Sequence, residues 1–299
     1  MDYLLIQIAN GLIIGLIYAL IAAGVTLVFS ILKIVNFADG ELYMLGGYFS
    51  YYAADLLGLP PVLALLAAIA ASFLFGVVFE RGFLGPLYSE GTERKPEYGL
   101  IVTFGLSVLL RNLAVNVFGP FPLRPPSFWP GVQHIGGLII QNDRIVAGGL
   151  SLLLFGALLY FMHRTAWGQA MDAVSQSRDS AAIVGINARF AFTAGFGLGQ
   201  ALAGAAGALV APLFSLSPSM GILPGIQAYV VVILGGLGSV LGSILGGLAI
   251  GLAETLFIAF FPDPMRSQSY SYAFTVFILM VVLFLRPTGF FGRRYVQME

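Results

Sequence analysis

The feature that most constrains this chain is a run of 64 consecutive residues, 190–253, that contains no Asp, Glu, Lys or Arg. At about 1.5 Å per helical residue, such a run is long enough to cross the hydrocarbon core of a bilayer roughly three times. Further runs of this kind, one of them interrupted only by Arg111, cover residues 3–32, 56–79, 98–123, 145–162 and 267–285. The chain is therefore expected to be a membrane protein.

These runs predict an all-α integral membrane protein, a single polytopic domain over residues 1–299 with eight or nine transmembrane helices. Residues 36–55 are less apolar, but they are long enough to cross if protein shields their acidic side chains. Prolines interrupt the longest run once, and the glycine-rich residues 235–239 offer a second break. We therefore expect a broken or re-entrant segment near Gly235. The choice between eight and nine passes depends on whether residues 224–261 form two spans or one hairpin.

The composition excludes most soluble activities. Only 9% of the residues are charged and the net charge is zero, so neither a soluble domain nor a nucleic-acid partner is expected. The chain has no cysteine, which rules out thiolate chemistry and Cys-ligated metals. Its two lysines, Lys33 and Lys95, follow Leu32 and Arg94, so the Gly-Lys pair of a phosphate-binding P-loop is missing. We expect no catalytic residue, cofactor or metal site, and any ATP hydrolysis must take place on other subunits.

Basic residues give the expected orientation, because Lys and Arg gather in cytoplasmic loops. If residues 164–189 lie in the cytoplasm, alternation of the spans places ten of the 14 Lys and Arg residues inside and three outside. With nine passes, the N-terminus is then outside and the C-terminus is in the cytoplasm. Residues 119–144 are rich in proline and aromatic side chains and are expected to form an ordered hairpin on the outer side.

Four polar side chains at membrane depth are candidates for a translocation path or gate, because polar groups there are costly and usually face protein or water. They are Asn36, Asp39, Glu41 and Glu254. A structural interpretation stays open for the three acids. Asp39 would cap the following helix, Glu41 would favour its positive N-terminal end, and Glu254 would accept a hydrogen bond inside the bundle.

Arg111 is a cation within a predicted span, so its charge needs a partner. The acids available at membrane depth are Glu41, Glu80 and Glu254, and the sequence does not choose among them. We expect a buried interhelical ion pair, with extension of the side chain to the outer interface as the alternative. In either case we expect Arg111 to serve assembly.

The segment predicted to be cytoplasmic has the pattern of short helices. Ser177 or Asp179 would cap a helix that Gly185 would end. This helix carries a face of small residues, formed by Ala181, Ala182 and Gly185, that would fit a groove in a partner protein. A solvated loop is the alternative.

Five segments in sequence order resemble the permease subunits of ABC importers for branched-chain amino acids, and in particular the shorter of the two permeases in such a system. They are residues 36–48, 103–107, 168–187, 235–254 and 286–292. Three residues depart from the pattern of this family. Asp39 stands where the family often has His, Gly47 stands where it often has Ala, and Asp172 stands where a basic residue is common.

The resemblance implies that several subunits share the work. A second permease would complete the pore, two cytoplasmic ABC ATPases would supply energy, and a periplasmic or extracellular binding protein would deliver the amino acid. The loop over residues 164–189 would be the coupling segment that the ATPases hold. Its contact residues would be Asp172, Asp179, Ala181, Ala182 and Gly185. The resemblance also implies alternating access, in the inner membrane of a bacterium.

Two alternatives to such an importer stay open on the sequence. An ion-coupled secondary transporter would use Asp39, Glu41 or Glu254 as its proton or sodium site and would need no ATPase. A membrane scaffold would transport nothing. The substrate also stays open, because related permeases carry amides, urea or other amino acids.

Overall fold

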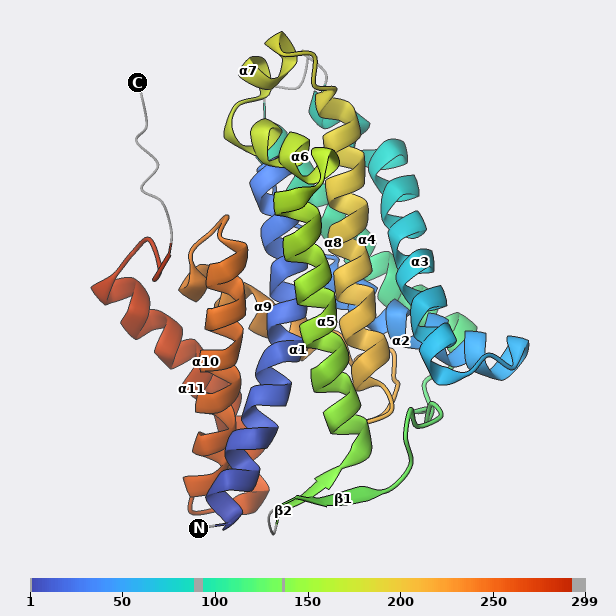
Figure 1. The fold of residues 1–299 in the computed structure, drawn as a ribbon, viewed down its shortest axis with the longest axis vertical. Coiled ribbons are helices and arrows are strands. Elements are labelled where there is room, and N and C mark those ends of the chain that lie inside the picture. The colour runs from blue at the N-terminus through green and yellow to red at the C-terminus, as the bar shows by residue number, and fades with distance from the viewer. Residues whose placement is uncertain (1, 89–93, 136–137, 292–299) are drawn as a thin grey trace.

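The computed structural model describes residues 2–88, 94–135 and 138–291, and within them nearly all regular structure is helical (Figure 1). The described bundle is made of α1 (Asp2–Leu32), α2 (Asp39–Leu57), α3 (Pro61–Phe79), α4 (Lys95–Phe118), α5 (Asn142–Arg164), α8 (Ala188–Val210), α9 (Ile222–Gly235), α10 (Val240–Phe260) and α11 (Pro264–Leu285). The shorter elements are the π-helix η1 (Glu80–Leu84), the 3-10 helix η2 (Gly85–Tyr88), α6 (Ala166–Gln176), α7 (Arg178–Ile183), β1 (Val132–Ile135) and β2 (Leu138–Gln141).

Seven of the described helical segments are long and apolar enough to cross a membrane: α1, α3 with its continuation through η1 and η2, α4, α5, α8, α10 and α11. By contrast, α2 carries Asp39 and Glu41, and α9 has only 14 residues. The polytopic all-α membrane fold is confirmed, whereas the count of eight or nine passes is not. The break expected near Gly235 is present, because α9 ends there and Gly236 and Gly238 have φ angles of 98° and 90°.

The centre of the bundle is α8, which packs against α1, α2 and α3 and is almost entirely buried. Small residues permit this packing. A Cβ atom added at Gly204 of α8 would overlap the side chain of Ser72 of α3, and one added at Gly46 of α2 would overlap the backbone of Gly204. Such close approach is typical of helices that associate in a membrane. It places α8 where three other helices can contact it.

The helix α2 runs across the bundle behind α8 rather than along it (Figure 1). Its first turns are buried, and Asp39 and Glu41 are only 1% and 4% exposed. Protein therefore shields the two acids, as the sequence required for residues at this depth. The crossing also brings the start of α2 against helices that lie far from it in the sequence.

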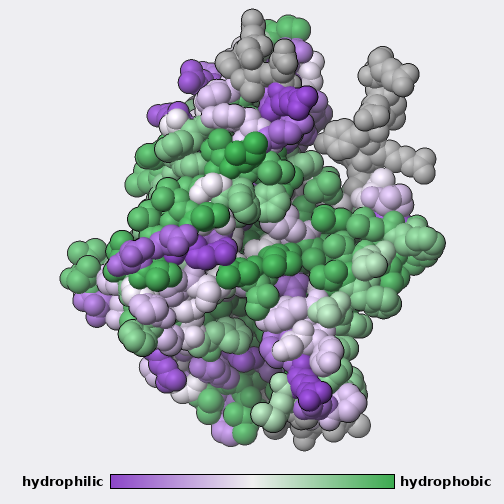
Figure 2. Space-filling model, turned by 180° about the vertical axis from the view of Figure 1, so that it is seen from behind, coloured by the Kyte–Doolittle hydropathy of each residue, from purple (hydrophilic) through white to green (hydrophobic). Residues whose placement is uncertain are grey.

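Two segments outside the long helices lie at opposite ends of the bundle (Figure 1). At one end β1 and β2 form an antiparallel ribbon, in which Val132 pairs with Gln141. This ribbon adds a small β element to the expected all-α fold. At the other end lie α6 and α7. On the face seen in Figure 2, hydrophobic residues predominate across the middle of the molecule, with a strongly hydrophilic strip and a mixed region below it. A broad hydrophobic surface of this kind is typical of a multi-pass membrane protein.

Candidate functional site

The first cluster of candidate residues lies where α1 ends and α2 begins. Asn36 Nδ2 donates a hydrogen bond to Asp39 Oδ1 at 2.6 Å, and Gln200 Nε2 of α8 donates to the same oxygen at 3.1 Å. Asn36 Oδ1 accepts from the Ala38 amide at 3.2 Å, and the Asn36 carbonyl accepts from the Tyr229 hydroxyl of α9. These contacts connect the loop between α1 and α2 to α2, α8 and α9 at one point, which we call the α1–α2 junction.

Thr103 of α4 completes the α1–α2 junction. Its Oγ1 accepts from the Phe37 amide at 3.2 Å and donates to the Gly99 carbonyl at 2.8 Å. The Phe37 ring contacts the rings of Phe104 and Tyr229, with centroid separations of 6.3 and 5.7 Å. Two of the segments that carry the family resemblance, residues 36–48 and 103–107, therefore meet in space.

Asp39 does not cap α2, so that structural interpretation is wrong. Ala38 occupies the capping position without a side-chain hydrogen bond, and Asp39 is the first helical residue. Asp39 Oδ2 and Gln200 Oε1 are both buried and have no hydrogen-bond partner among the described residues. Because unpaired buried acceptors are costly, a further hydrogen-bond donor at these two oxygens would stabilise the junction.

Glu41 forms an ion pair with Arg111 of α4. Of the three acids that the sequence offered to Arg111, the structure selects this one. The Glu41 side chain is 5% exposed and the Arg111 side chain is 40% exposed. The carboxylate of the pair is therefore buried, whereas the arginine side chain is partly exposed.

Glu254 lies apart from this junction, in a cavity of about 250 Å³ bordered by α1, α2, α9, α10, α11, the end of α8 and the loop between α8 and α9. Ser271 Oγ of α11 donates to Glu254 Oε1 at 3.3 Å, so the predicted hydrogen bond inside the bundle exists. Glu254 Oε2 is buried and has no partner in the part of the chain that the structure describes. Tyr43, one turn after Asp39 on α2, also lines this cavity. The predicted path residues thus form two clusters that α2 connects.

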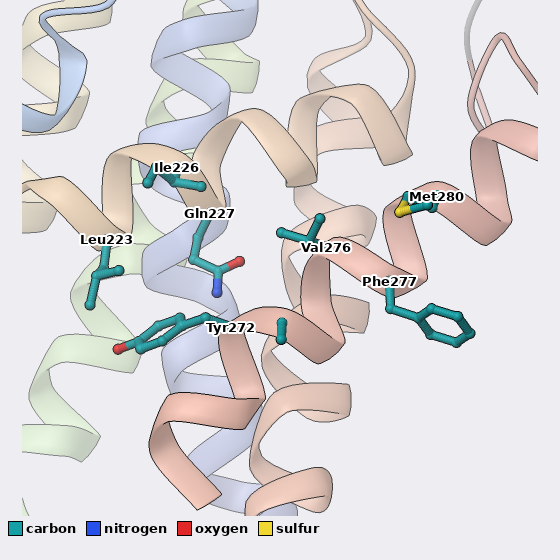
Figure 3. Close-up of a pocket in the computed structure, with 8 residues that line it drawn as sticks. Leu223, Ile226, Gln227, Tyr272, Val276, Phe277 and Met280 are labelled. Atoms are coloured by element: carbon teal, nitrogen blue, oxygen red, sulfur yellow. The ribbon is translucent and has the colours of Figure 1, made fainter. Parts of the chain in front are cut away.

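An apolar groove of about 420 Å³ lies next to the Glu254 cavity, between α9 and α11 (Figure 3). Leu223 and Tyr272 line both hollows. Gln227 points from α9 toward α11, and its Oε1 is buried without a partner among the described residues. Lipid tails cannot satisfy such a group, so this groove differs from an ordinary lipid-facing surface.

The predicted coupling segment forms α6 and the short helix α7. Of the two capping residues offered by the sequence, Ser177 makes the cap: its Oγ accepts from the Ser180 amide at 3.2 Å. After α7, Gly185 adopts a φ of 80°, the left-handed conformation expected for a residue that ends a helix. The local fold of this segment is therefore the predicted one.

The predicted contact residues of this segment differ in how exposed they are. Those open to solvent are Asp172, Asp179, Ala182 and Gly185. Ala181 is only 2% exposed and packs inside the chain, so it does not lie on an open face. Ile183 and Val184 are 86% and 73% exposed instead. These two side chains give the end of α7 an exposed apolar tip, which the resemblance to a small-residue core did not indicate.

A network that the sequence did not predict connects α7 to the bundle. Arg178 Nη2 donates to the Leu32 carbonyl at the end of α1 at 3.2 Å, and the Arg178 guanidinium lies 4.6 Å from the ring centroid of Phe192. Phe192 of α8 stacks on Tyr88 of η2 with a centroid separation of 4.6 Å. The first residue of α7 is thereby held against α1 and α8.

The same network continues to a buried carboxylate. The Tyr88 hydroxyl donates to Glu80 Oε1 at 2.6 Å, and Thr193 Oγ1 of α8 donates to Glu80 Oε2 at 2.6 Å. Glu80 is 1% exposed and begins the π-helix η1, a type of helix that occurs often at functional sites. The sequence offered Glu80 only as a partner for Arg111. We call these residues, Arg178, Phe192, Tyr88, Glu80 and Thr193, the Glu80 network.

Comparison with known proteins places these features in a family. A family model described as "Branched-chain amino acid transport system / permease component" matches residues 7–283. The chain belongs to this family. The permease is 35% identical to BraD, a high-affinity branched-chain amino acid transport system permease protein of Pseudomonas aeruginosa, in a match that covers 97% of this chain and 96% of BraD.

A second relative and one solved structure complete the comparison. The permease is 30% identical to LivH, the protein of the same description from Escherichia coli K12, over 99% of this chain and 97% of LivH. It is also similar to the structure of PsaBC from Streptococcus pneumoniae in complex with Fab, with a TM-score of 0.48 and 14% identity over 93% of this chain and 91% of the other. The two sequence relatives are transport permeases and not enzymes.

Proposed function

We propose that this permease carries leucine, isoleucine, valine or a related apolar amino acid across the bacterial inner membrane, driven by ATP that separate subunits hydrolyse. The observation that carries the proposal is the similarity to BraD and LivH over nearly the full length of each chain. Both relatives are named as high-affinity branched-chain amino acid permeases. The α1–α2 junction, with Asn36, Asp39 and Glu41, and the Glu254 cavity supply the gate and path of this permease.

Two cytoplasmic ABC ATPases hold the segment formed by α6 and α7. In support, α7 exposes Ile183 and Val184 at its end while Arg178 anchors its start to the bundle. A segment with an exposed apolar tip and an anchored start can bind a partner through the tip and transmit the partner's movement to the membrane-spanning helices. Asp172, Asp179, Ala182 and Gly185 lie around this apolar tip.

A second permease covers the groove between α9 and α11. Its supporting observation is the unpaired Gln227 Oε1, since only protein or water can donate a hydrogen bond to it at membrane depth. Many apolar side chains of α11 are open in this chain, among them Phe277, Met280 and Phe284. A partner helix would bury this face and complete the path beside it.

The end of the bundle that carries β1 and β2 faces outward, and there a periplasmic or extracellular binding protein delivers the substrate. The end that carries α6 and α7 faces the cytoplasm, because Arg164, Arg178 and Arg189 lie in or beside this segment. With nine passes, this orientation places the N-terminus outside and the C-terminus in the cytoplasm.

Uptake by the reconstituted transporter tests the proposal. We expect proteoliposomes that contain this chain, its partner permease and the ATPases to accumulate leucine only when ATP and the binding protein are present. An ATPase variant without its catalytic glutamate serves as the control and should abolish uptake. Uptake driven by an ion gradient in liposomes that contain only this chain would contradict the proposal and support a secondary transporter.

A further inference from the structure

The Glu254 cavity holds a carboxylate without a compensating cation. None of the described residues that line the cavity is Lys, Arg or His. Glu254 is 3% exposed; its Oε1 accepts from Ser271 at 3.3 Å, and its Oε2 lacks a donor among the described residues. Buried carboxylates are normally paired with a cation or fully hydrogen-bonded. The cavity therefore offers a free acceptor oxygen to a group from outside the chain, and a cationic group there would favour the ionised form of Glu254.

The rest of the wall suits an organic cation better than a metal ion. No group of three or more His, Asp or Glu residues able to hold a metal exists within the described ranges. The lining includes the hydroxyl-bearing side chains of Tyr18 and Ser219 and the aliphatic side chains of Ile14 and Ile258. A hard cation takes about six oxygen ligands. An ammonium group needs a few acceptors, and aliphatic walls accommodate the carbon chain attached to it.

We propose that this cavity is a subsite for the α-ammonium group of the transported amino acid, with Glu254 as its counter-ion and the aliphatic wall against its side chain. The volume of about 250 Å³ lies just below that of pockets for drug-sized ligands and is in keeping with a single small amino acid. The subsite rests on the proposed function, because that function supplies the ligand.

Leucine uptake by the assembled transporter gives the first test. Glu254→Gln keeps the shape of the side chain and removes its charge, so we expect the maximal uptake rate to fall about tenfold or more. Glu97→Gln makes the same chemical change at an exposed carboxylate in the first turn of α4 and should leave uptake unchanged. Both variants are first checked for equal amounts of assembled complex.

Thiol labelling gives a second test that does not depend on transport. The chain has no cysteine, so Ser219→Cys places its single thiol at the cavity. We expect a cationic aminoethyl methanethiosulfonate to be favoured over the anionic sulfonatoethyl reagent. Adding Glu254→Gln should lower this preference about threefold or more, because it removes the charge. Leucine and isopentylamine should slow labelling, whereas 4-methylpentanoate, which lacks the ammonium group, should not.

The outcomes separate the subsite from the proposed function. If the unaltered transporter does not import leucine, the proposed function fails and the subsite fails with it. If it imports leucine while Glu254→Gln changes neither uptake nor reagent preference, the subsite alone is overturned. Equal loss in Glu97→Gln, or protection by sodium ions in place of leucine and isopentylamine, overturns the subsite as well. In the latter case the cavity binds an inorganic cation.

Discussion

At the scale of single residues, the pair of Arg111 and Glu41 shows how a charge is kept at membrane depth. Glu41 lies in the first turn of α2 and is buried, whereas Arg111 comes from α4 and is 40% exposed. Removing the cation leaves a buried carboxylate without its partner, but removing the acid leaves a partly exposed cation on a long side chain that can extend toward the membrane interface. Loss of Arg111 is therefore expected to reduce stability more than loss of Glu41 does.

Arg111→Leu is expected to lower the free energy of unfolding of the permease by about 2 kcal/mol. This is less than the roughly 3–5 kcal/mol lost when a fully buried ion pair is broken. Glu41→Gln should cost less, and the double variant Arg111→Leu with Glu41→Leu should recover part of the loss. The measurement is the thermal melting of the detergent-solubilised protein, with Asn112→Leu on the same helix as control. A change in substrate preference at unchanged stability would instead place Arg111 in the path.

The sequence could predict the need for such a pair but not its members. From the sequence, Glu41, Glu80 and Glu254 were equal candidates for the partner of Arg111. Only the folded structure distinguishes them, because the crossing of α2 behind α8 brings Glu41 to α4. The same crossing explains why the capping role of Asp39 was wrong. Gln200 and Asn36 reach its carboxylate across 161 and three residues of chain, and no local pattern encodes the first of these contacts.

At the scale of elements, the Glu80 network makes α7 part of the bundle. Arg178 is held by the end of α1 and by Phe192 of α8, and the stacked ring of Tyr88 carries the contact to η1. Movement of α7 must then move α8, the central helix, or break these contacts. The network is therefore a mechanical link between the ATPase contact and the spans, in the proposed function.

Tyr88→Phe tests this link, because it keeps the stacking on Phe192 and removes the hydrogen bond to Glu80. We expect more ATP to be hydrolysed for each leucine imported, with a stability loss of about 1 kcal/mol. The measurement is the ratio of ATP hydrolysis to leucine uptake in proteoliposomes. Tyr98→Phe removes a comparable hydroxyl, which donates to the Phe83 carbonyl at 2.8 Å, and should leave the ratio unchanged. An unaltered ratio in Tyr88→Phe would mean that the network only stabilises the fold.

Gly185→Glu tests the contact with the ATPases. The change puts bulk and charge beside the exposed apolar tip of α7, so uptake should fall about tenfold or more while insertion into the membrane is kept. Because Gly185 has a φ of 80°, part of any effect is backbone strain. Gly58→Glu is the matched control, since Gly58 is also exposed and has a φ of 63°. Normal uptake in Gly185→Glu, or equal loss in Gly58→Glu, would contradict the coupling role.

Elements with strong local signals were predictable, and elements made by distant contacts were not. The cap at Ser177 and the stop at Gly185 indicated α7 because both act within one turn. The hairpin expected within residues 119–144 is present as the ribbon of β1 and β2, but its strands were not predicted because each has only four residues. Nothing in the apolar run of α3 signals that it continues into a π-helix at Glu80, whose carboxylate is held by groups from η2 and α8.

At the scale of the whole molecule, the buried centre of the bundle contrasts with the exposed apolar face of α11. The central helix α8 is almost fully buried, whereas α11 presents Met280 and Phe284 at 64% and 89% exposure. Exposure to lipid alone would account for these apolar side chains. It does not account for Gln227, whose amide oxygen is buried at the groove beside them without a partner among the described residues.

Gln227→Leu distinguishes a groove covered by the second permease from a groove covered by lipid, because the change is expected to be destabilising in the first case and stabilising in the second. If the second permease donates a hydrogen bond to this amide, the change should weaken the complex, and less partner should co-purify as the detergent concentration rises. If lipid covers the groove, the change removes an unsatisfied polar group and should raise the melting temperature of the chain, with no effect on the partner. We expect the first result, with a loss of about 1–2 kcal/mol in association. Met280→Leu, an apolar exchange of similar size in the same groove, is the control and should alter neither measurement.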